Sequence, residues 1–238
     1  MNSTISSVPQ KTYHITDFLN AGLLIVLQIG VLIGWDVAPT LTQPDFIIFT
    51  IGMIIGMIGV GLNLYDPTAR DISKKVVFIS GLVILFCFGS FFAQNSLIND
   101  YTPLLGAGFW LSMGVCVLLC VQYLIPSPET LSTSSLTKII EKSPFNSIFA
   151  ITSLVLVVLN LAQGVSFMRD HANKLTLGVV ALGIGIFGVW LIFYFTNELV
   201  ENLPDNIRDG LRPFVFVGPA IAILFVFLVY PTINTVIL

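Results

Sequence analysis

The chain has 238 residues, of which 55% are hydrophobic and only 10% are charged. A soluble domain usually carries about 25% charged residues, so this composition excludes an ordinary water-soluble fold. The net charge of -3 arises from residues in or beside the predicted connections, and it forms no basic stripe of the kind that binds nucleic acid. We therefore expect an all-α, polytopic bundle of transmembrane helices, with membrane lipid around it and no nucleic-acid partner.

Long apolar runs account for most of the chain, and each is close to the ~20 residues that a helix needs to cross ~30 Å of hydrocarbon. Such runs predict transmembrane helices. In chain order the seven predicted spans cover residues 18–38, 46–65, 76–93, 104–124, 145–167, 175–195 and 214–235.

The distribution of Lys and Arg predicts the orientation, because these residues are held on the cytoplasmic side during insertion. Arg169 and Lys174 lie in a connection on one side of the membrane. The other basic residues fall on the opposite side: Lys11, Arg70, Lys74, Lys75, Lys138, Lys142, Arg208 and Arg212. We therefore expect a cytoplasmic N-terminus and, after an odd number of spans, an external C-terminus.

The second span contains a series of glycines, Gly52, Gly56 and Gly59. Glycine lets two helix backbones approach closely in lipid, where apolar burial supplies no drive for association. We interpret the series as a helix-packing surface, and a ligand path is the less favoured alternative.

The fifth span carries a polar pair, Asn160 and Gln163, which share one helix face because they are three residues apart. In a membrane such side chains usually hydrogen-bond a neighbouring helix. We favour this packing role over contact with a substrate.

Sites for metals, cofactors and catalysis are not predicted. Cys87, Cys116 and Cys120 lie inside apolar runs and behave as small hydrophobes, and His14 and His171 fall at opposite faces of the membrane. The sequence has no HExxH motif and no paired intramembrane aspartates. We expect no enzyme activity, no metal and no cofactor.

From Asn197 onward a short motif series surrounds the last apolar run. A basic residue and a proline precede the run, a glycine and a proline lie within it, and Tyr-Pro ends it; these residues are Arg212, Pro213, Gly218, Pro219, Tyr230 and Pro231. This series resembles the entry segment of permease subunits of bacterial carbohydrate ABC importers, in the maltose, alpha-glucoside and glucosylglycerol class. The resemblance covers about a sixth of the chain.

The resemblance implies the N-terminal part of a longer permease, because the family has further spans and a cytoplasmic loop that docks on the ATPase. Residues 1–196 then form a six-span block, residues 197–213 a cytoplasmic interfacial linker restarted at Pro204, and residues 214–238 the first span of the permease core. The implied location is the bacterial inner membrane. The implied partners are a second permease subunit, ATPase subunits and a periplasmic solute-binding protein.

The resemblance thus predicts a part in the uptake of a sugar or a sugar-derived compatible solute, with no transport by these 238 residues alone. The alternative is a self-contained multipass scaffold or accessory subunit that acts through helix contacts.

Overall fold

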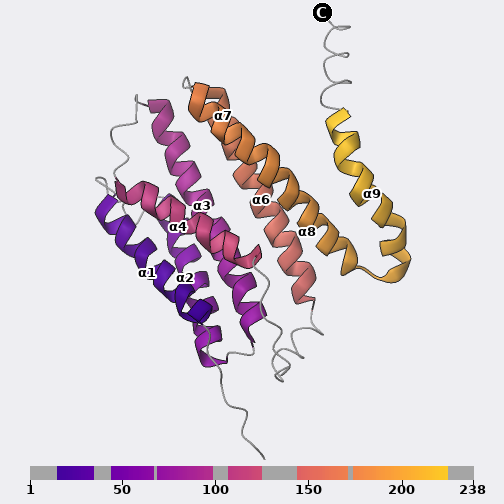
Figure 1. Ribbon diagram of the computed structural model, residues 1–238, viewed down its shortest axis with the longest axis horizontal. Helices are drawn as coiled ribbons and strands as arrows, with labels where there is room; N and C mark the ends of the chain where they lie inside the picture. The colour runs from indigo at the N-terminus through magenta and orange to yellow at the C-terminus, as the bar shows by residue number, and fades with distance from the viewer. Residues whose placement is uncertain are drawn as a thin grey trace, which may run out of the picture. The chain divides into compact units, whose positions relative to one another are not determined.

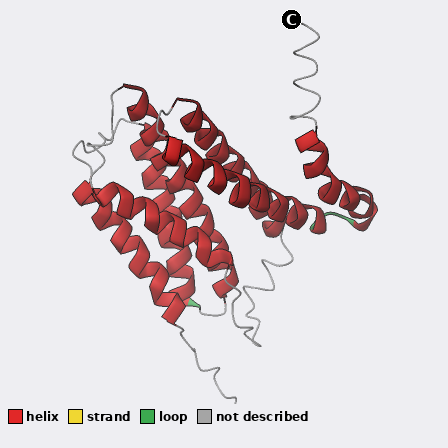
Figure 2. Cartoon of the chain, turned by 45° about the horizontal axis from the view of Figure 1, so that its top comes forward, coloured by secondary structure: helices red, strands yellow, loops and turns green. Residues whose placement is uncertain are grey.

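The computed structural model describes residues 15–34, 44–66, 69–98, 107–124, 144–170 and 174–224. Nearly all of these residues lie in helices, and none of them forms a strand (Figure 1, Figure 2). Within these ranges four helices are long and apolar enough to cross a membrane: Pro44–Tyr65, Arg70–Phe91, Phe145–Ser166 and Val180–Glu201. The all-helical fold class is therefore confirmed for the described residues, which include helices long and apolar enough to span a membrane.

The predicted second, third, fifth and sixth spans coincide with these four helices. The predicted first and fourth spans coincide with the shorter apolar helices Phe18–Val31 and Gly108–Leu124. The predicted seventh span begins inside the last described helix and continues outside the described residues. Seven spans and their orientation stay predictions.

The chain divides into two compact units, Met1–Lys142 and Ser143–Leu238. In the first unit α2 packs along α3, α3 packs on α4, and α4 packs on α1, whereas α1 and α2 touch each other over a smaller area. The helices of this unit are α1 (Ile15–Gly34), α2 (Pro44–Tyr65), α3 (Arg70–Ile98) and α4 (Ala107–Leu124).

The core of the first unit is built around Phe88, which is completely buried. Its ring makes edge-to-face contacts with Phe49 of α2 at 6.2 Å and with Phe109 of α4 at 5.5 Å between centroids. Leu27 of α1 is also completely buried in this core. Aromatic pairs in this geometry add to the stabilisation from burial alone.

The second unit contains α6 (Phe145–Asp170) and one continuous helical segment made of α7 (Lys174–Gly183), η2 (Ile184–Gly188) and α8 (Val189–Glu201). The η2 stretch is a π-helix turn, a feature that usually occurs as a single-turn bulge. The segment packs on α6, and α8 also packs on α9 (Asp205–Leu224).

The π-helix turn fits against α6 through two glycines that face large side chains. A β-carbon built at Gly164 of α6 would lie 2.6 Å from Cδ1 of Ile184, and one built at Gly188 would collide with Leu161. Each helix therefore supplies one glycine and one branched side chain to the contact. Nearer the cytoplasmic end predicted for these helices, Phe149 and Phe195 stack edge to face at 5.8 Å.

The break between α8 and α9 lies at Pro204, where the sequence predicts that the linker restarts. The side-chain amide of Asn202 donates to the carbonyl of Glu198 at 2.7 Å, which satisfies one end of α8. The carbonyl of Pro204 then accepts from Ile207 and Arg208, so α9 begins directly after the proline. The expected linker, residues 197–213, therefore begins in α8 and ends in α9, and α9 continues from residue 213 into the described part of the following predicted span.

Candidate functional site

Gly52, Gly56 and Gly59 are buried on the side of α2 that faces α3. A β-carbon built at Gly56 would lie 2.7 Å from Oγ of Ser80 on α3 and 3.0 Å from a methyl carbon of Leu24 on α1. These separations are shorter than ordinary van der Waals contact. The glycines therefore allow the backbone of α2 to lie against its neighbours.

A ladder of three hydrogen bonds joins α3 to the backbone of α2, and the sequence alone did not predict it. Every donor is a small side chain on α3, and every acceptor is a main-chain carbonyl of α2. The pairs are Ser73 Oγ to Gly59 O at 2.7 Å, Ser80 Oγ to Gly52 O at 2.7 Å and Cys87 Sγ to Asp45 O at 2.9 Å.

The ladder repeats every seven residues on both helices, which is the period at which neighbouring α-helices meet in left-handed packing. A membrane hydrogen bond between helices contributes about 0.6 kcal/mol on average, so the ladder adds to the contact that the glycines permit. The sequence does contain a matching pattern. Ser73, Ser80 and Cys87 are spaced seven residues apart on α3, and Gly52 and Gly59 have the same spacing on α2.

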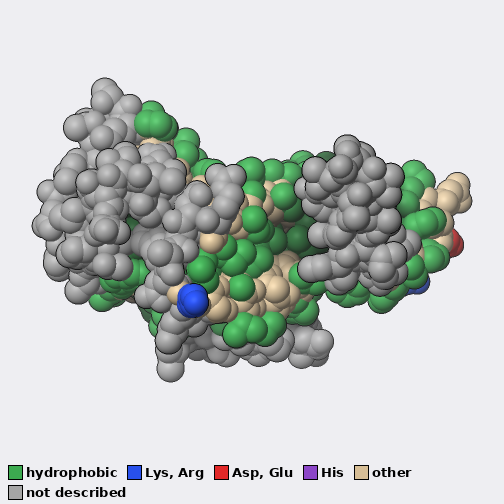
Figure 3. Space-filling view, turned by 90° about the horizontal axis from the view of Figure 1, so that it is seen from above, with side chains coloured by type: hydrophobic (Ala, Val, Ile, Leu, Met, Phe, Trp, Pro, Cys, Tyr) green, Lys and Arg blue, Asp and Glu red, His purple; other side chains and the backbone are tan. Residues whose placement is uncertain are grey.

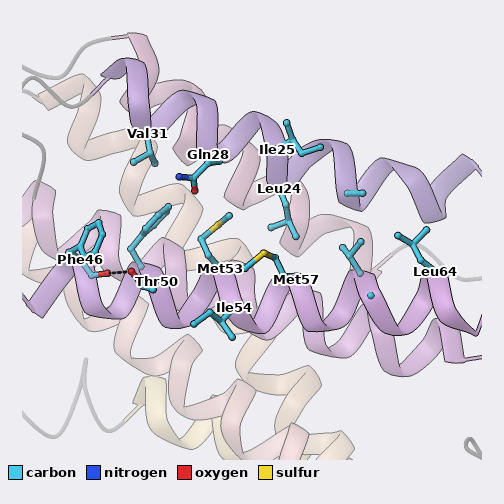
Figure 4. Close-up of a pocket in the computed structure, with 14 residues that line it drawn as sticks. Leu24, Ile25, Gln28, Val31, Phe46, Thr50, Met53, Ile54, Met57 and Leu64 are labelled. Carbon is cyan, nitrogen blue, oxygen red and sulfur yellow. Dashed lines mark hydrogen bonds between the residues drawn. The ribbon is translucent and has the colours of Figure 1, made fainter. Parts of the chain in front are cut away.

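The open seam between α1 and α2 contains an apolar groove with a volume of about 860 Å³. Its lining comes from these two helices, and the α2 side runs from Phe46 to Leu64 (Figure 4). Met53 and Met57 lie in the middle of the α2 wall. The groove exists because α1 packs mainly on α4 and α2 packs mainly on α3, so α1 and α2 are not closely packed against each other.

Two polar side chains line the groove, and they differ in their hydrogen bonding. The hydroxyl of Thr50 donates to the carbonyl of Phe46 at 2.8 Å, within its own helix. The side chain of Gln28 is exposed on α1 and points toward α2, and its amide makes no hydrogen bond to the part of the chain that is described (Figure 4). The groove can therefore hold an apolar molecule and offer it one amide.

One member of the predicted polar pair of α6 makes a hydrogen bond within its own helix. The side-chain amide of Asn160 donates to the carbonyl of Leu156 at 2.8 Å, one turn back on the same helix. Gln163 is half-buried, and its side-chain oxygen has no hydrogen-bond partner among the described residues. A bond from this pair to a neighbouring helix stays a prediction.

The family-like residues fall partly on α9. Arg212 and Pro213 are exposed, and a β-carbon built at Gly218 would meet no atom of its neighbours within 4 Å. Pro219 lies within the same helix. The predicted Tyr230 and Pro231 lie outside the described residues.

Within the described ranges, no group of three or more His, Cys, Asp or Glu side chains is placed to hold a metal ion. No family model, curated protein or solved structure matches the chain.

Proposed function

We propose that the chain is the N-terminal membrane part of a permease that imports a sugar or a sugar-derived compatible solute into a bacterial cell. In this proposal it crosses the inner membrane seven times from a cytoplasmic N-terminus. The observation that supports it is α9, whose polar first half continues into an apolar second half within the segment that resembles the carbohydrate permeases.

The first half of α9 has the character of an interfacial helix. Arg208 forms an ion pair with Asp205 at 2.6 Å, three residues earlier on the exposed side of the helix, while Ile207 and Leu211 present apolar surface. Charged and apolar sides on one helix are typical of a segment that lies at the membrane surface. An entry helix that starts in the cytoplasmic interface needs this arrangement.

The second half of α9 is attached to the preceding helices. Val215 is buried, and Phe216 packs edge to face on Phe193 of α8 with centroids 5.6 Å apart. Since α8 also packs on α6, we infer that the extension before Asn197 positions the entry helix of the permease core. Hydrolysis of ATP and capture of the solute belong to the partner subunits.

The test is ATP-dependent solute uptake into proteoliposomes that contain the binding protein, the second permease subunit and the ATPase. We expect no uptake and no stable ATPase binding with residues 1–238 alone, and both activities with a chain that continues through the family's docking loop. Deletion of residues before about Asn197 from that longer chain should preserve uptake and weaken assembly. Uptake by residues 1–238 alone would contradict the proposal.

A second candidate is a multipass scaffold or accessory subunit that acts through helix contacts. The observation in its favour is the first unit, in which the α2–α3 ladder and a buried core hold the helices together without any transport motif. A stop codon directly after codon 238 in the genomic sequence would favour this candidate, and an open frame leading into a docking loop would favour the permease.

A further inference from the structure

The two walls of the groove have the residue spacing of helices that pack against another helix. On both walls, lining residues recur at alternating intervals of three and four positions, which is the repeat of left-handed helix packing. The α2 residues with this spacing are Phe46, Thr50, Met53, Met57, Val60 and Leu64. Those of α1 are Ala21, Leu24, Gln28 and Val31. Because α1 and α2 touch each other only over a small area, a further helix is needed to complete the packing of both surfaces.

Gln28 indicates that this helix carries a polar group. Hydrophobic side chains predominate among the described atoms of the face in Figure 3, so apolar exposure alone does not distinguish a helix-binding surface from a lipid-facing one. Gln28 is the middle residue of the predicted first span, residues 18–38, and it points into the groove (Figure 4). Hydrocarbon at that depth offers no donor or acceptor to an amide. The groove therefore favours an occupant with a hydrogen-bonding group at the centre of the bilayer.

The relative depths of the residues around the groove follow from one contact between its walls. A β-carbon built at Gly56 would lie 3.0 Å from a methyl carbon of Leu24, so these two residues are at the same level of the antiparallel helices α1 and α2 (Figure 4). Phe18 lies six residues before Leu24, a rise of about 9 Å. Gly61 lies five residues after Gly56, a rise of about 7.5 Å in the same direction. Phe18, which is exposed, and Gly61, which has open space around it, are therefore at about the same depth.

We propose that α1 of a second copy of this chain occupies the groove, and that the two copies make this contact reciprocally about a two-fold axis along the membrane normal. Each residue then meets residues of its own depth in the other copy. The Gln28 side chains of the two copies hydrogen-bond each other near the axis, because an amide carries both a donor and an acceptor. Phe18 of each copy lies against Gly61 of the other.

The self-complementary amide selects a second copy over an unrelated helix, since a two-fold axis brings each Gln28 to the one group that matches it in depth and in chemistry. Two-fold dimers are also the commonest symmetric oligomers. The proposal does not depend on the permease function, because it rests on α1 and α2 alone.

Photocross-linking of the full chain in phosphatidylcholine vesicles tests which face forms the contact. The photoreactive residue p-benzoylphenylalanine replaces Ile25, which lines the groove and is exposed. Irradiation at a low protein-to-lipid ratio should give a covalent dimer, and mass spectrometry should locate the link in α1 or α2 of the second copy. The control places the same residue at Val155, which is exposed on α6, and should give no covalent dimer.

Energy transfer between donor-labelled and acceptor-labelled copies, measured as the vesicles are diluted with lipid, gives the dissociation constant of the dimer. Gln28→Leu should raise this constant about eightfold, the factor that corresponds to two average membrane hydrogen bonds. Gln163→Leu, the same change on α6, should leave it unchanged.

Gly61→Leu tests the groove without touching the amide. It should also raise the dissociation constant, because its side chain fills the space that Phe18 of the second copy takes. Gly114→Leu is the matched control, since Gly114 is exposed on α4 with open space around it. Both glycine variants should keep the thermal unfolding of the monomer in detergent unchanged.

A Gln28→Leu variant that fails to fold is replaced by Gln28→Met, which also removes the amide. Absence of energy transfer at every protein-to-lipid ratio would overturn the proposal. Equal dissociation constants for the original chain, Gln28→Leu and Gly61→Leu would also overturn it, because the copies would then meet elsewhere. Cross-links from position 25 that join the chain only to lipid would show that lipid fills the groove, and would overturn it as well.

Discussion

At the scale of single residues, Gly56 and Gly61 lie on the same helix in opposite surroundings. Gly56 faces Ser80 at a distance that leaves no room for a side chain, whereas Gly61 is exposed with no atom within 4 Å of a β-carbon. We expect Gly56→Leu to destabilise the bundle by about 1–3 kcal/mol through overpacking. Gly61→Leu should have little effect. Thermal unfolding in detergent measures both, and an unchanged melting temperature for Gly56→Leu would place that face of α2 away from its neighbours.

Ser80 tests the ladder in the same way. Ser80→Ala removes the donor to the carbonyl of Gly52 with almost no change in volume, so we expect a loss of about 0.6 kcal/mol and no more than about 1.7 kcal/mol. Ser112→Ala is the control, because that hydroxyl bonds the carbonyl of Gly108 within α4. Equal melting temperatures for the two variants would show that the bond between helices contributes nothing.

Some residues of the helix contacts and the groove could be recognised from the sequence pattern, and others could not. The glycine series of α2 stands out because Gly is visible at every third or fourth position of the apolar run. Gln28 was missed because a single amide hardly lowers the hydropathy of a long apolar run. Ser73, Ser80 and Cys87 were missed because their spacing can be interpreted only when it is known that α3 packs against α2.

At the scale of elements, the location of the helices was predictable because a backbone in lipid satisfies its polar groups within the helix. Their pairing was not, since lipid is as apolar as the side chains and leaves the choice of partner to packing and hydrogen bonds. The π-helix turn at Ile184–Gly188 was also missed. No local feature of its sequence distinguishes a π turn from an α turn.

The π-helix turn gives a prediction of its own. Gly188→Leu places a side chain against Leu161, so we expect a loss of about 1–3 kcal/mol from overpacking. Gly185→Leu changes the same turn at an exposed position with open space around it, and it should be tolerated. Thermal unfolding of the two variants provides the comparison, and a melting temperature lowered equally by both would assign the effect to the turn itself rather than to the contact with α6.

At the scale of the whole molecule, the sequence predicted a change of character at Asn197, where the family resemblance begins. The compact units instead divide between Lys142 and Ser143, inside the connection between the fourth and fifth predicted spans. The two divisions answer different questions. The resemblance concerns evolutionary origin, whereas compact units reflect which helices touch, and helix contacts are not visible in hydropathy.

The orientation is tested by fusing a reporter that is active only in the cytoplasm. We expect activity after Lys75 and Lys142 and none after Asp100 and Lys174, because Lys and Arg concentrate on the side that stays inside. Expression levels of each fusion, measured by immunoblot, are the control. Reversed activity at two or more of these sites would invert the predicted topology.

The repeat of the α2–α3 ladder means that the ladder alone does not define one alignment of the two helices. If α3 slid by seven residues, Ser80 would meet the carbonyl of Asp45 and Ser73 that of Gly52, so two of the three bonds would form again. α2 ends at Tyr65 and α3 begins at Arg70, and so short a turn has no spare length for that slide. Insertion of seven flexible residues there would remove this restriction, so the length of the turn helps to select the native register.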